Sequence, residues 1–415
     1  MSRCAGRACR SATAGKRSLY AISGGEGSRR PTTVPSPLSA AGAGKVRLGD
    51  VLSVKARIGW QGLTQKEHRV SGEYNLVTGT DFVDGKVDFS KCVFVDKERY
   101  DQDENIQLRN GDLLITKDGT IGKVAVVENM PRPATLNSGV FVVRDVASNF
   151  LIRYLYHFFL APEFRKLVDG KLTGCTIAHL NQKVLVNLSI PLPPLPTQQR
   201  IADELDQLCA LKKNAEDRLA ILDQIVKSRF VEMFGDPTQN DRNLPLAFLP
   251  DFGENLDGRR IPITSSDRIE GPYPYYGASG IVDHVEGFIF DEDLLLISED
   301  GANLLLRSTP IAFSVKGKVW VNNHAHVIRF PDLATQVFVE HFLNAVKIDK
   351  YVTGSAQPKL NQAKLNSIPI MNPPLALQRE FAAFVAEVDK SKLTLRETVA
   401  TLDQLYRAKL QEYFG

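Results

Sequence analysis

The sequence RLAILDQIVKSRFVEMFG at residues 218–235 recurs as TVATLDQLYRAKLQEYFG at residues 398–415. The same offset of 180 residues aligns HLNQKVLVNLSIPLPPLPTQQRIA at 179–202 with KLNQAKLNSIPIMNPPLALQREFA at 359–382, and ten of these twenty-four positions are identical. Two long matches at one offset indicate an internal duplication, and a repeat of this size is far longer than a solenoid unit. The chain is therefore predicted to contain one domain and one helix, each present twice.

Apolar residues recur in both copies at alternating spacings of four and three, which is typical of a coiled-coil seam. The apolar seam positions are Ile201, Leu205, Leu208, Leu219, Leu222 and Val226 in the first copy, and Phe381, Val385, Val388, Leu395, Val399 and Leu402 in the second. Sustained over more than four heptads, this pattern favours pairing of the two helices with each other. Two independent amphipathic helices, each packed on its own domain, are the alternative.

Basic residues interrupt both seams at equivalent places, Lys212 and Lys392, then Arg229 and Lys409. In a parallel pair in register these like charges would face each other, which is unfavourable. In an antiparallel pair, Lys212 meets Leu402 and Lys392 meets Leu222, and the lysines can extend past the leucines to water. The sequence therefore predicts an antiparallel pair, with one globular domain at each end.

The expected fold class is α+β, with two globular domains joined by two long helices in a pseudo-two-fold arrangement. Proline at 193–196 is expected to precede the first helix, Thr197 to cap it and Gly235 to end it. The expected divisions are an N-terminal extension at 1–44, domains at 45–196 and 237–376, and spacer helices at 197–236 and 377–415. The extension has transit-peptide-like composition, but we expect a disordered tail or a start assigned too early.

The overall charge of +3 hides an uneven distribution. Residues 1–44 hold seven basic residues and one acidic residue, so the remainder is slightly acidic, and any DNA binding must depend on local basic patches. No apolar run is long enough to span a membrane. The five cysteines lie far apart without a CxxC pair, which suits a reducing, cytoplasmic environment and argues against a zinc ribbon.

Two related domains on a rigid spacer would suit a target with two separated halves, and DNA supplies such targets. The segments that carry a more specific resemblance are IPLPPL at 190–195, QQRIA at 198–202, LD at 222–223 and KSRFVEMFGDP at 227–237. They resemble the central repeat of the specificity subunit of type I restriction–modification systems. Segments of both domains resemble that family's target recognition domains, namely 105–108, 117–123, 273–281, 299–304 and 320–326.

The resemblance covers residues 45–415 and implies a sequence-specific DNA-recognition subunit without catalysis. It implies two target recognition domains, one for each half of a bipartite target. It also implies double-stranded DNA, two modification (methyltransferase) subunits and, through them, restriction (endonuclease) subunits as partners. S-adenosylmethionine, ATP and Mg²⁺ are then expected on those partner subunits only. The basic N-terminal extension departs from the family pattern.

In the first domain, the loop 57–64 holds a tryptophan among polar groups, and the turn 117–123 has a lysine at each end between two strand-like runs. Lysine and arginine side chains position DNA by contacting phosphates. A plain hairpin turn is the alternative for 117–123. The candidate DNA-binding residues of this domain are Arg57, Trp60, Thr64, Lys117, Thr120, Lys123 and Asn137.

In the second domain, basic residues are candidates for phosphate contacts, and tyrosines beside glycines for close backbone contacts. Asparagine and histidine near 322–324 are candidates for base edges, since asparagine binds adenine with two hydrogen bonds. The alternatives are tyrosines in the core and a polar turn that caps its own backbone. The candidates are Arg259, Arg260, Arg268, Tyr273, Tyr275, Tyr276, Ser279, Lys316, Lys318, Asn322, Asn323 and His324.

Two other functions remain as alternatives: a self-contained DNA adenine methyltransferase or nuclease, and a coiled-coil adaptor that binds no DNA. The tetrapeptide Asn372–Leu375 resembles a catalytic motif of adenine methyltransferases, but its last residue is not the aromatic one needed to stack a flipped base. His324 and His326 are two residues apart without further ligands nearby in sequence, so no metal site is expected.

Overall fold

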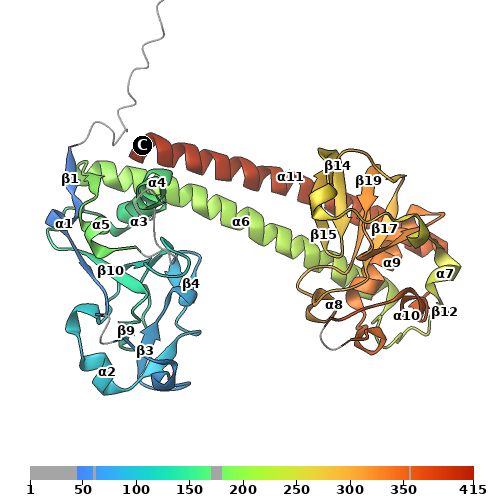
Figure 1. Ribbon diagram of the computed structural model, residues 1–415, viewed down its shortest axis with the longest axis horizontal. Helices are drawn as coiled ribbons and strands as arrows, with labels where there is room; N and C mark the ends of the chain where they lie inside the picture. Colours follow the sequence, from blue (N-terminus) through green and yellow to red (C-terminus); the bar gives the residue numbers. More distant parts are fainter. Residues whose placement is uncertain (1–43, 59–61, 170–179, 355–356) are drawn as a thin grey trace, which may run out of the picture.

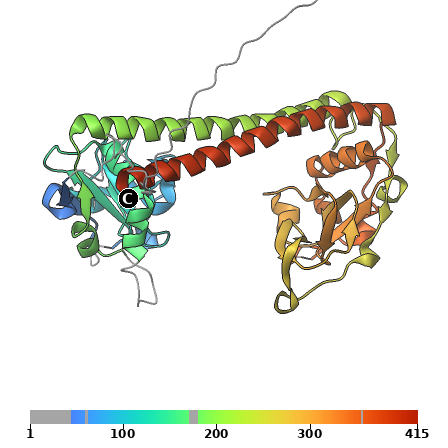
Figure 2. The same ribbon diagram turned by 90° about the horizontal axis from the view of Figure 1, so that it is seen from above.

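The computed structural model describes residues 44–58, 62–169, 180–354 and 357–415. Two helices of 40 residues each, α6 (Leu195–Phe234) and α11 (Leu375–Phe414), lie side by side and run antiparallel between two globular bodies (Figure 1). At about 1.5 Å per residue, each helix is about 60 Å long. Both bodies lie on the same side of the helical pair (Figure 2). The predicted two-headed α+β architecture is confirmed.

The two long helices begin and end at equivalent residues of the duplication. Pro194 and Pro374 are their N-caps, so the expectation that Thr197 caps the first helix is wrong. Pro196 lies within the first turn, where the backbone N–H has no acceptor inside the helix and a proline is tolerated. Gly235 ends α6 with a φ of 82°, a conformation that glycine adopts without strain.

The basic residues of the seam define the register of the antiparallel pair. Lys212 Nζ lies 2.8 Å from Asp403 Oδ1, and Lys392 Nζ lies 2.7 Å from Asp223 Oδ1. The predicted neighbours, Leu402 and Leu222, are each one residue away from these aspartates. The two ion pairs are equivalent under the 180-residue offset, so they express the pseudo-two-fold symmetry directly. The spacing of the seam lysines therefore predicts the register to within one residue but does not predict the acidic partners.

The seam residues are all buried or half-buried, and the most buried ones lie at the two ends of the helical pair. The first body packs on the start of α6 and the end of α11, through Ile201, Leu205 and Phe414 among others. The second body packs on the end of α6 and the start of α11, where the rings of Phe230, Phe234 and Phe381 contact one another. Each end of the helical pair is therefore part of a globular core.

The first body, residues 44–193, contains a six-stranded sheet in the order β2-β10-β7-β8-β5-β4 and a three-stranded sheet in the order β6-β3-β9. Its elements are β1 (Lys45–Arg47), α1 (Leu48–Val51), β2 (Leu52–Lys55), β3 (Tyr74–Val77), β4 (Phe82–Val83), β5 (Lys86–Val87), β6 (Val93–Val95), α2 (Lys97–Asp101), β7 (Leu113–Thr116), β8 (Val124–Val126), β9 (Ala134–Leu136), β10 (Val140–Asp145), α3 (Ile152–Leu160), α4 (Pro162–Asp169), α5 (Gln182–Val186) and β11 (Ser189–Pro191).

The second body, residues 236–373, contains two four-stranded sheets in the orders β13-β20-β17-β18 and β15-β14-β19-β16. Its elements are β12 (Leu246–Ala247), α7 (Leu249–Phe252), β13 (Glu254–Asn255), β14 (Glu270–Gly277), β15 (Gly280–Val285), β16 (Phe290–Asp291), β17 (Leu294–Ser298), α8 (Asn303–Leu306), β18 (Ala312–Val315), β19 (Lys318–Val321), β20 (Ala325–Arg329), α9 (Leu333–Ala345), α10 (Gln362–Leu365) and β21 (Ile370–Met371).

The strand orders show that the two bodies share a common core. The antiparallel run β2-β10-β7-β8 corresponds to β13-β20-β17-β18, and the mixed run β6-β3-β9 corresponds to β15-β14-β19, with a parallel pair at β3–β9 and at β14–β19. A two-stranded ribbon closes each body where the chain enters and leaves it, β1 with β11 and β12 with β21. The divergence seen in the sequence therefore leaves this core unchanged, while β5 and β4 extend the larger sheet of the first body and β16 joins β19 in the second.

Of the expected N-terminal extension at 1–44, only Gly44 lies within the described residues. Among the described residues, no helix combines the length and the apolar character that crossing a lipid bilayer requires.

Glu340→Gln is expected to stabilise the second body by up to about 3 kcal/mol above pH 7. Burial raises the pKa of Glu340 from 4.5 to about 7, and its carboxylate accepts a hydrogen bond from Ser314 Oγ (2.5 Å). The unfolded carboxyl ionises first as pH rises, so the native state loses stability from about pH 4.5 up to about pH 7. Glutamine can still accept the hydrogen bond but carries no charge.

Urea unfolding of wild type and Glu340→Gln at pH 5 and pH 8 tests this pH dependence. The stabilisation should be clear at pH 8 and small at pH 5. Burial lowers the pKa of the neighbouring His341 to about 4, which gives the opposite slope, but this group is present in both proteins and largely cancels in the comparison. An equal effect at both pH values would contradict the assignment.

Candidate nucleic-acid interface

Each body brings two turns together at the same place in its topology: the turn after β7 or β17, and the turn before β10 or β20. In the first body, the Lys117 amide donates to the Gly139 carbonyl (2.9 Å), and in the second the Glu299 amide donates to the His324 carbonyl (2.9 Å). A third segment adds an equivalent bond in each body, from Leu180 to Lys117 and from Leu360 to Glu299. We call the turns at Lys117 and Gly139 the paired turns of the first body, and those at Glu299 and His324 the paired turns of the second.

The first body's paired turns border a pocket of about 320 Å³ that contains three predicted DNA-binding residues, Thr120, Lys123 and Asn137. The predicted hairpin β7–β8 is present and carries Thr120 and Lys123 on its exposed tip. Lys117 is half-buried, with its ammonium group 5.6 Å from the centre of the Phe141 ring. The pocket is rich in hydroxyl and amide groups, which suit contacts to phosphate oxygens or base edges.

The segment 78–80, which is not among the residues predicted from the sequence, forms another wall of this pocket. Thr78 and Thr80 are joined by a hydrogen bond between their hydroxyl groups (2.7 Å), and Thr78 begins a short 3₁₀ turn after β3. The Thr-Gly-Thr-Asp run after an apolar strand was the available signal, because such polar runs form turns. It lies forty residues from the hairpin, so its proximity followed only from the fold.

The second body's paired turns group His324 with Asn323, Ser279 and Tyr276. The His324 side chain is about half exposed, and its Nδ1 lies 2.7 Å from Asp300 Oδ2, which orients the ring and leaves Nε2 for other contacts. The Ser298 hydroxyl donates to the Ala278 carbonyl, so the turn that carries Ser279 adjoins the end of β17. Tyr276 is half-buried beside Phe313.

Three predicted DNA-binding residues are buried and a fourth, Arg260, is mostly buried, and we correct their assignment. Arg57 is 1% exposed and donates to the Leu136 carbonyl (2.9 Å) and to Thr135 Oγ1 (3.1 Å), so it holds β9 in place. Burial also lowers the pKa of Arg57. Tyr275 is 1% exposed, with its hydroxyl against the backbone of Ile263, as the core alternative proposed.

Asn322 and Arg260 are the other two corrections. Asn322 Oδ1 accepts from the His324 amide (2.8 Å), so Asn322 caps its own turn, as its alternative proposed. The Arg260 guanidinium lies 2.8 Å from Glu299 and also donates to the Ala325 carbonyl (2.7 Å). Both side chains form hydrogen bonds within the paired turns or to the strand that follows them, and little of their surface is exposed.

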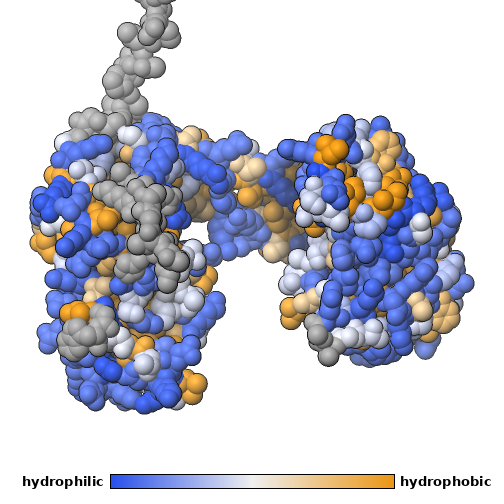
Figure 3. Space-filling view, viewed as in Figure 1, coloured by the Kyte–Doolittle hydropathy of each residue, from blue (hydrophilic) through white to orange (hydrophobic). Residues whose placement is uncertain are grey.

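Several cationic candidates of the second body lie over aromatic rings. The Arg259 guanidinium is 4.7 Å from the Phe290 ring centre and 3.2 Å from Glu292, and Arg268 covers the ring of Tyr275. Lys318 lies over the rings of Phe288 and Tyr273. Figure 3 shows apolar side chains gathered on the upper part of this body.

Three further candidates remain. Lys316 of the second body and Thr64 of the first body are exposed, and Trp60 lies outside the described residues.

The structure gives a structural role to the methyltransferase-like tetrapeptide at 372–375. The Asn372 amide donates to the Pro245 carbonyl (2.7 Å), Pro373 accepts from Gln378 Nε2 (2.8 Å), and Pro374 caps α11. The segment joins the closing ribbon of the second body to the helical pair. This position argues against its use as a catalytic motif.

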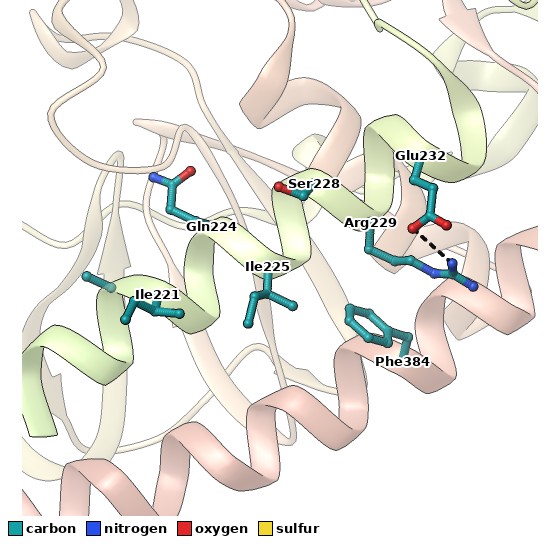
Figure 4. Close-up of a pocket in the computed structure, with 8 residues that line it drawn as sticks. Ile221, Gln224, Ile225, Ser228, Arg229, Glu232 and Phe384 are labelled. Carbon is teal, nitrogen blue, oxygen red and sulfur yellow. Dashed lines mark ion pairs between the residues drawn. The ribbon is translucent and has the colours of Figure 1, made fainter.

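A separate groove of about 780 Å³ lies along α6 near the second body, with Phe384 of α11 at its edge. Ile225 points from α6 toward Phe384 of α11, and Arg229 and Glu232 form an ion pair (3.0 Å) at one end (Figure 4). Ile221 and Ile225 keep 57% and 42% of their surface exposed. Branched apolar side chains gathered in one groove are a feature of protein interfaces.

Both bodies carry paired turns with polar side chains, and the bodies lie at opposite ends of the helical pair. This arrangement defines a class of protein that recognises a target at two separate places. The chain belongs to the family of the type I restriction modification DNA specificity domain, whose model matches residues 42–221 and 247–404.

Two curated relatives are specificity subunits by name. The chain is 38% identical over 132 residues to a putative type I restriction enzyme specificity subunit of Haemophilus influenzae, which covers 32% of this chain and 34% of that protein. It is 26% identical over 180 residues to the putative type I restriction enzyme MjaX specificity subunit of Methanocaldococcus jannaschii, covering 42% of each. The chain thus spans about a third of the length of the first relative and about two fifths of the length of the second.

The fold is also similar to a solved structure, the S subunit of a type I restriction–modification system from M. genitalium. The TM-score is 0.55 at 14% identity, and the match covers 93% of this chain and 98% of that one. At this identity the match supports the shared fold of two bodies on a helical pair.

Proposed function

We propose that this chain is the sequence-specific DNA-recognition subunit of a type I restriction–modification complex. Each body would bind one half of a bipartite target, and the helical pair would set the distance between the halves. The observation that carries the proposal is the recurrence of the paired turns on two bodies that share a common core, on the same side of a stiff spacer (Figure 2). Divergent side chains on a common frame suit two different half-site sequences.

The chemistry of the turns supports DNA as the ligand. Lys123 and Arg259 offer positive charge near the surface, while hydroxyl, amide and imidazole groups offer donors and acceptors for base edges. The remainder of the chain is slightly acidic, so binding would depend on these local groups. A coiled-coil adaptor that does not bind DNA would have no use for two equivalent polar sites.

Lys123→Ala and Arg259→Ala are each expected to weaken DNA binding without changing the preferred sequence. Each loses one phosphate contact, so the slope of log affinity against log salt concentration should become shallower by about one. Fluorescence anisotropy with labelled duplexes at several salt concentrations measures this slope. Lys390→Ala on the helical pair is the matched control, because Lys390 is exposed and paired with Glu387. An unchanged slope in both variants would count against the proposed interface.

Under this proposal, partner methyltransferase and endonuclease subunits carry out catalysis, with S-adenosylmethionine, ATP and Mg²⁺ bound to them. The names of the relatives, which call them specificity subunits, support an assembly with other subunits. The chain would act in the cytoplasm, where its DNA target lies. We propose the groove along α6 near the second body as the docking surface for a helix of one methyltransferase subunit, because a third helix packs naturally between two others.

Ile225→Asp is expected to remove one of two bound methyltransferase subunits, weakening that contact about tenfold or more. The equivalent residue at the other end is Leu405, which is 43% exposed against 42% for Ile225. Leu405→Asp should remove the second copy, and the double variant should bind neither. Light scattering of the purified complexes reports the stoichiometry, and Leu393→Asp, exposed outside the groove lining, is the control. Two bound copies in every variant would exclude this surface.

A further inference from the structure

Four ionisable side chains meet beneath the paired turns of the second body. Asp257, Glu299 and His326 bring ligand-type atoms within 4.8 Å of one another. Arg260 joins them, 2.8 Å from Glu299 and 3.5 Å from Asp257. Asp257 and Glu299 lie far from His326 in sequence, so the sequence pattern around His326 does not reveal this group. The guanidinium already supplies the positive charge between the two carboxylates, so a structural network fits better here than a metal site.

The hydrogen bonds of His326 determine its charge within this network. Its Nδ1 lies 2.6 Å from Asp257 Oδ2 and its Nε2 lies 2.8 Å from the Leu360 carbonyl, so both ring nitrogens face acceptors. A ring that donates from both nitrogens carries a positive charge. The mostly buried carboxylates of Asp257 and Glu299 then face the Arg260 guanidinium and this ring, and the half-exposed Lys359 ammonium lies 3.2 Å from Glu299 at the edge of the network. Each buried charge therefore has a partner of opposite sign, which is the condition under which buried charges are tolerated.

The network connects every segment that forms the paired turns. Asp257 Oδ1 also accepts from the Val327 amide (2.8 Å), which ties the 257–260 turn to β20. Glu299 lies at the end of β17, and its backbone bonds to His324 and Leu360. The pair of exposed His324 and mostly buried Asp300 is therefore held by the residues immediately below it.

The first body has different chemistry at the equivalent positions. Ile115 faces Phe141 in the β7–β10 register, as Ile297 faces His326 in the β17–β20 register. Lys117 over Phe141 in the first body thus corresponds to Glu299 beside His326 in the second. The same two strands carry a cation–aromatic contact in one body and an ion network in the other.

Resting on the proposed DNA-recognition function, we propose that Asp257, Arg260, Glu299 and His326 form a positioning network that fixes the Asp300–His324 turn for recognition of the second half-site. These residues are positioning residues, because they act through the turn and do not contact DNA. The network determines how sharply the second body discriminates bases, and it leaves the nonspecific phosphate contacts unchanged.

The network can be tested with the full chain by selection from a pool of DNA duplexes. Each duplex carries two randomised blocks, one for each half-site, and the bound duplexes are sequenced. Glu299→Gln keeps the shape of the side chain but removes the negative charge that faces Arg260, His326 and Lys359. Base preference in the second half-site should fall about tenfold, since a misplaced bidentate contact loses discrimination of that order. Preference in the first half-site and affinity for unrelated duplex DNA should not change.

Two further variants separate positioning from folding. The double variant Arg260→Met with Glu299→Gln leaves Asp257 and His326 as a balanced pair and should recover part of the lost preference. Glu254→Gln, which breaks an exposed ion pair with Arg329 in the same body, should change nothing. Full base preference in Glu299→Gln, or an equal loss in both half-sites that follows thermal stability, would overturn the proposal. If the wild-type chain enriches no base sequence in either randomised block, the proposed function itself fails and this inference fails with it.

Discussion

Inserting seven residues into each long helix is expected to lengthen the preferred gap between the half-sites by about two to three base pairs, without changing either half-site. Seven residues preserve the heptad seam and add about 10 Å to a helix, against 3.4 Å for each base pair along DNA. The structure indicates where the insertions belong. Placed after Arg218 in α6 and after Thr398 in α11, they lie near the pseudo-two-fold axis.

At these positions the insertions keep all the ion pairs between the helices. Lys212–Asp403 and Lys409–Glu204 remain within the half near the first body, and Lys392–Asp223 and Arg229–Glu380 remain within the half near the second. Both globular cores also keep their own helix ends. The helical pair should therefore fold with the extra length, and only the separation of the bodies should change.

Selection from duplexes in which the gap between half-sites varies measures the preferred gap of wild type and variant. A seven-residue insertion in α6 alone is the control, because it shifts one helix against the other and separates Lys392 from Asp223. That variant should lose binding through misfolding of the helical pair. A doubly lengthened chain that keeps the wild-type gap would show that the helices do not set the spacing.

The sequence predicted the helical pair because its signal is periodic and repeated. The register could be predicted to within one residue from the positions of Lys212 and Lys392 alone, since a lysine in a seam restricts the possible partners. Helix α6 begins two residues before the predicted start at 197, because the first turn of a helix tolerates a proline such as Pro196.

The candidate site was predicted less well, because a residue type does not say whether its side chain points inward. Arg259 and Arg260 are adjacent and looked equivalent, yet one lies at the surface over Phe290 and the other is buried against Glu299, thirty-nine residues away in sequence. Thr120 and Lys123 were placed correctly because a short hairpin between two strands leaves its tip exposed. Partners distant in sequence become neighbours only through sheet topology, which the sequence pattern did not determine.

Replacing residues 242–376 with the equivalent segment of another family member is expected to change one half of the target completely and leave the other half unaltered. The second body is entered and left at one place, through the ribbon in which Leu246 pairs with Met371 and Ala247 with Ile370. Few structural elements therefore have to match across the two junctions. Because α6 and the rest of α11 are retained, the spacing between half-sites should also be retained.

The contact between the second body and the helical pair sets the requirement for a successful exchange. The Phe338 ring of α9 stacks on Phe230 at 5.5 Å between ring centres and contacts Phe234 edge-on at 4.9 Å. Both of these rings belong to α6, so the incoming domain must supply an aromatic or large apolar side chain in place of Phe338. Losing a buried phenylalanine typically destabilises a protein by about 3–5 kcal/mol. Phe338→Ala in the parent chain is therefore the folding control, and it should lower stability without creating a new half-site preference. An exchanged chain that folds and still selects the original second half-site would show that residues outside 242–376 determine that half of the target.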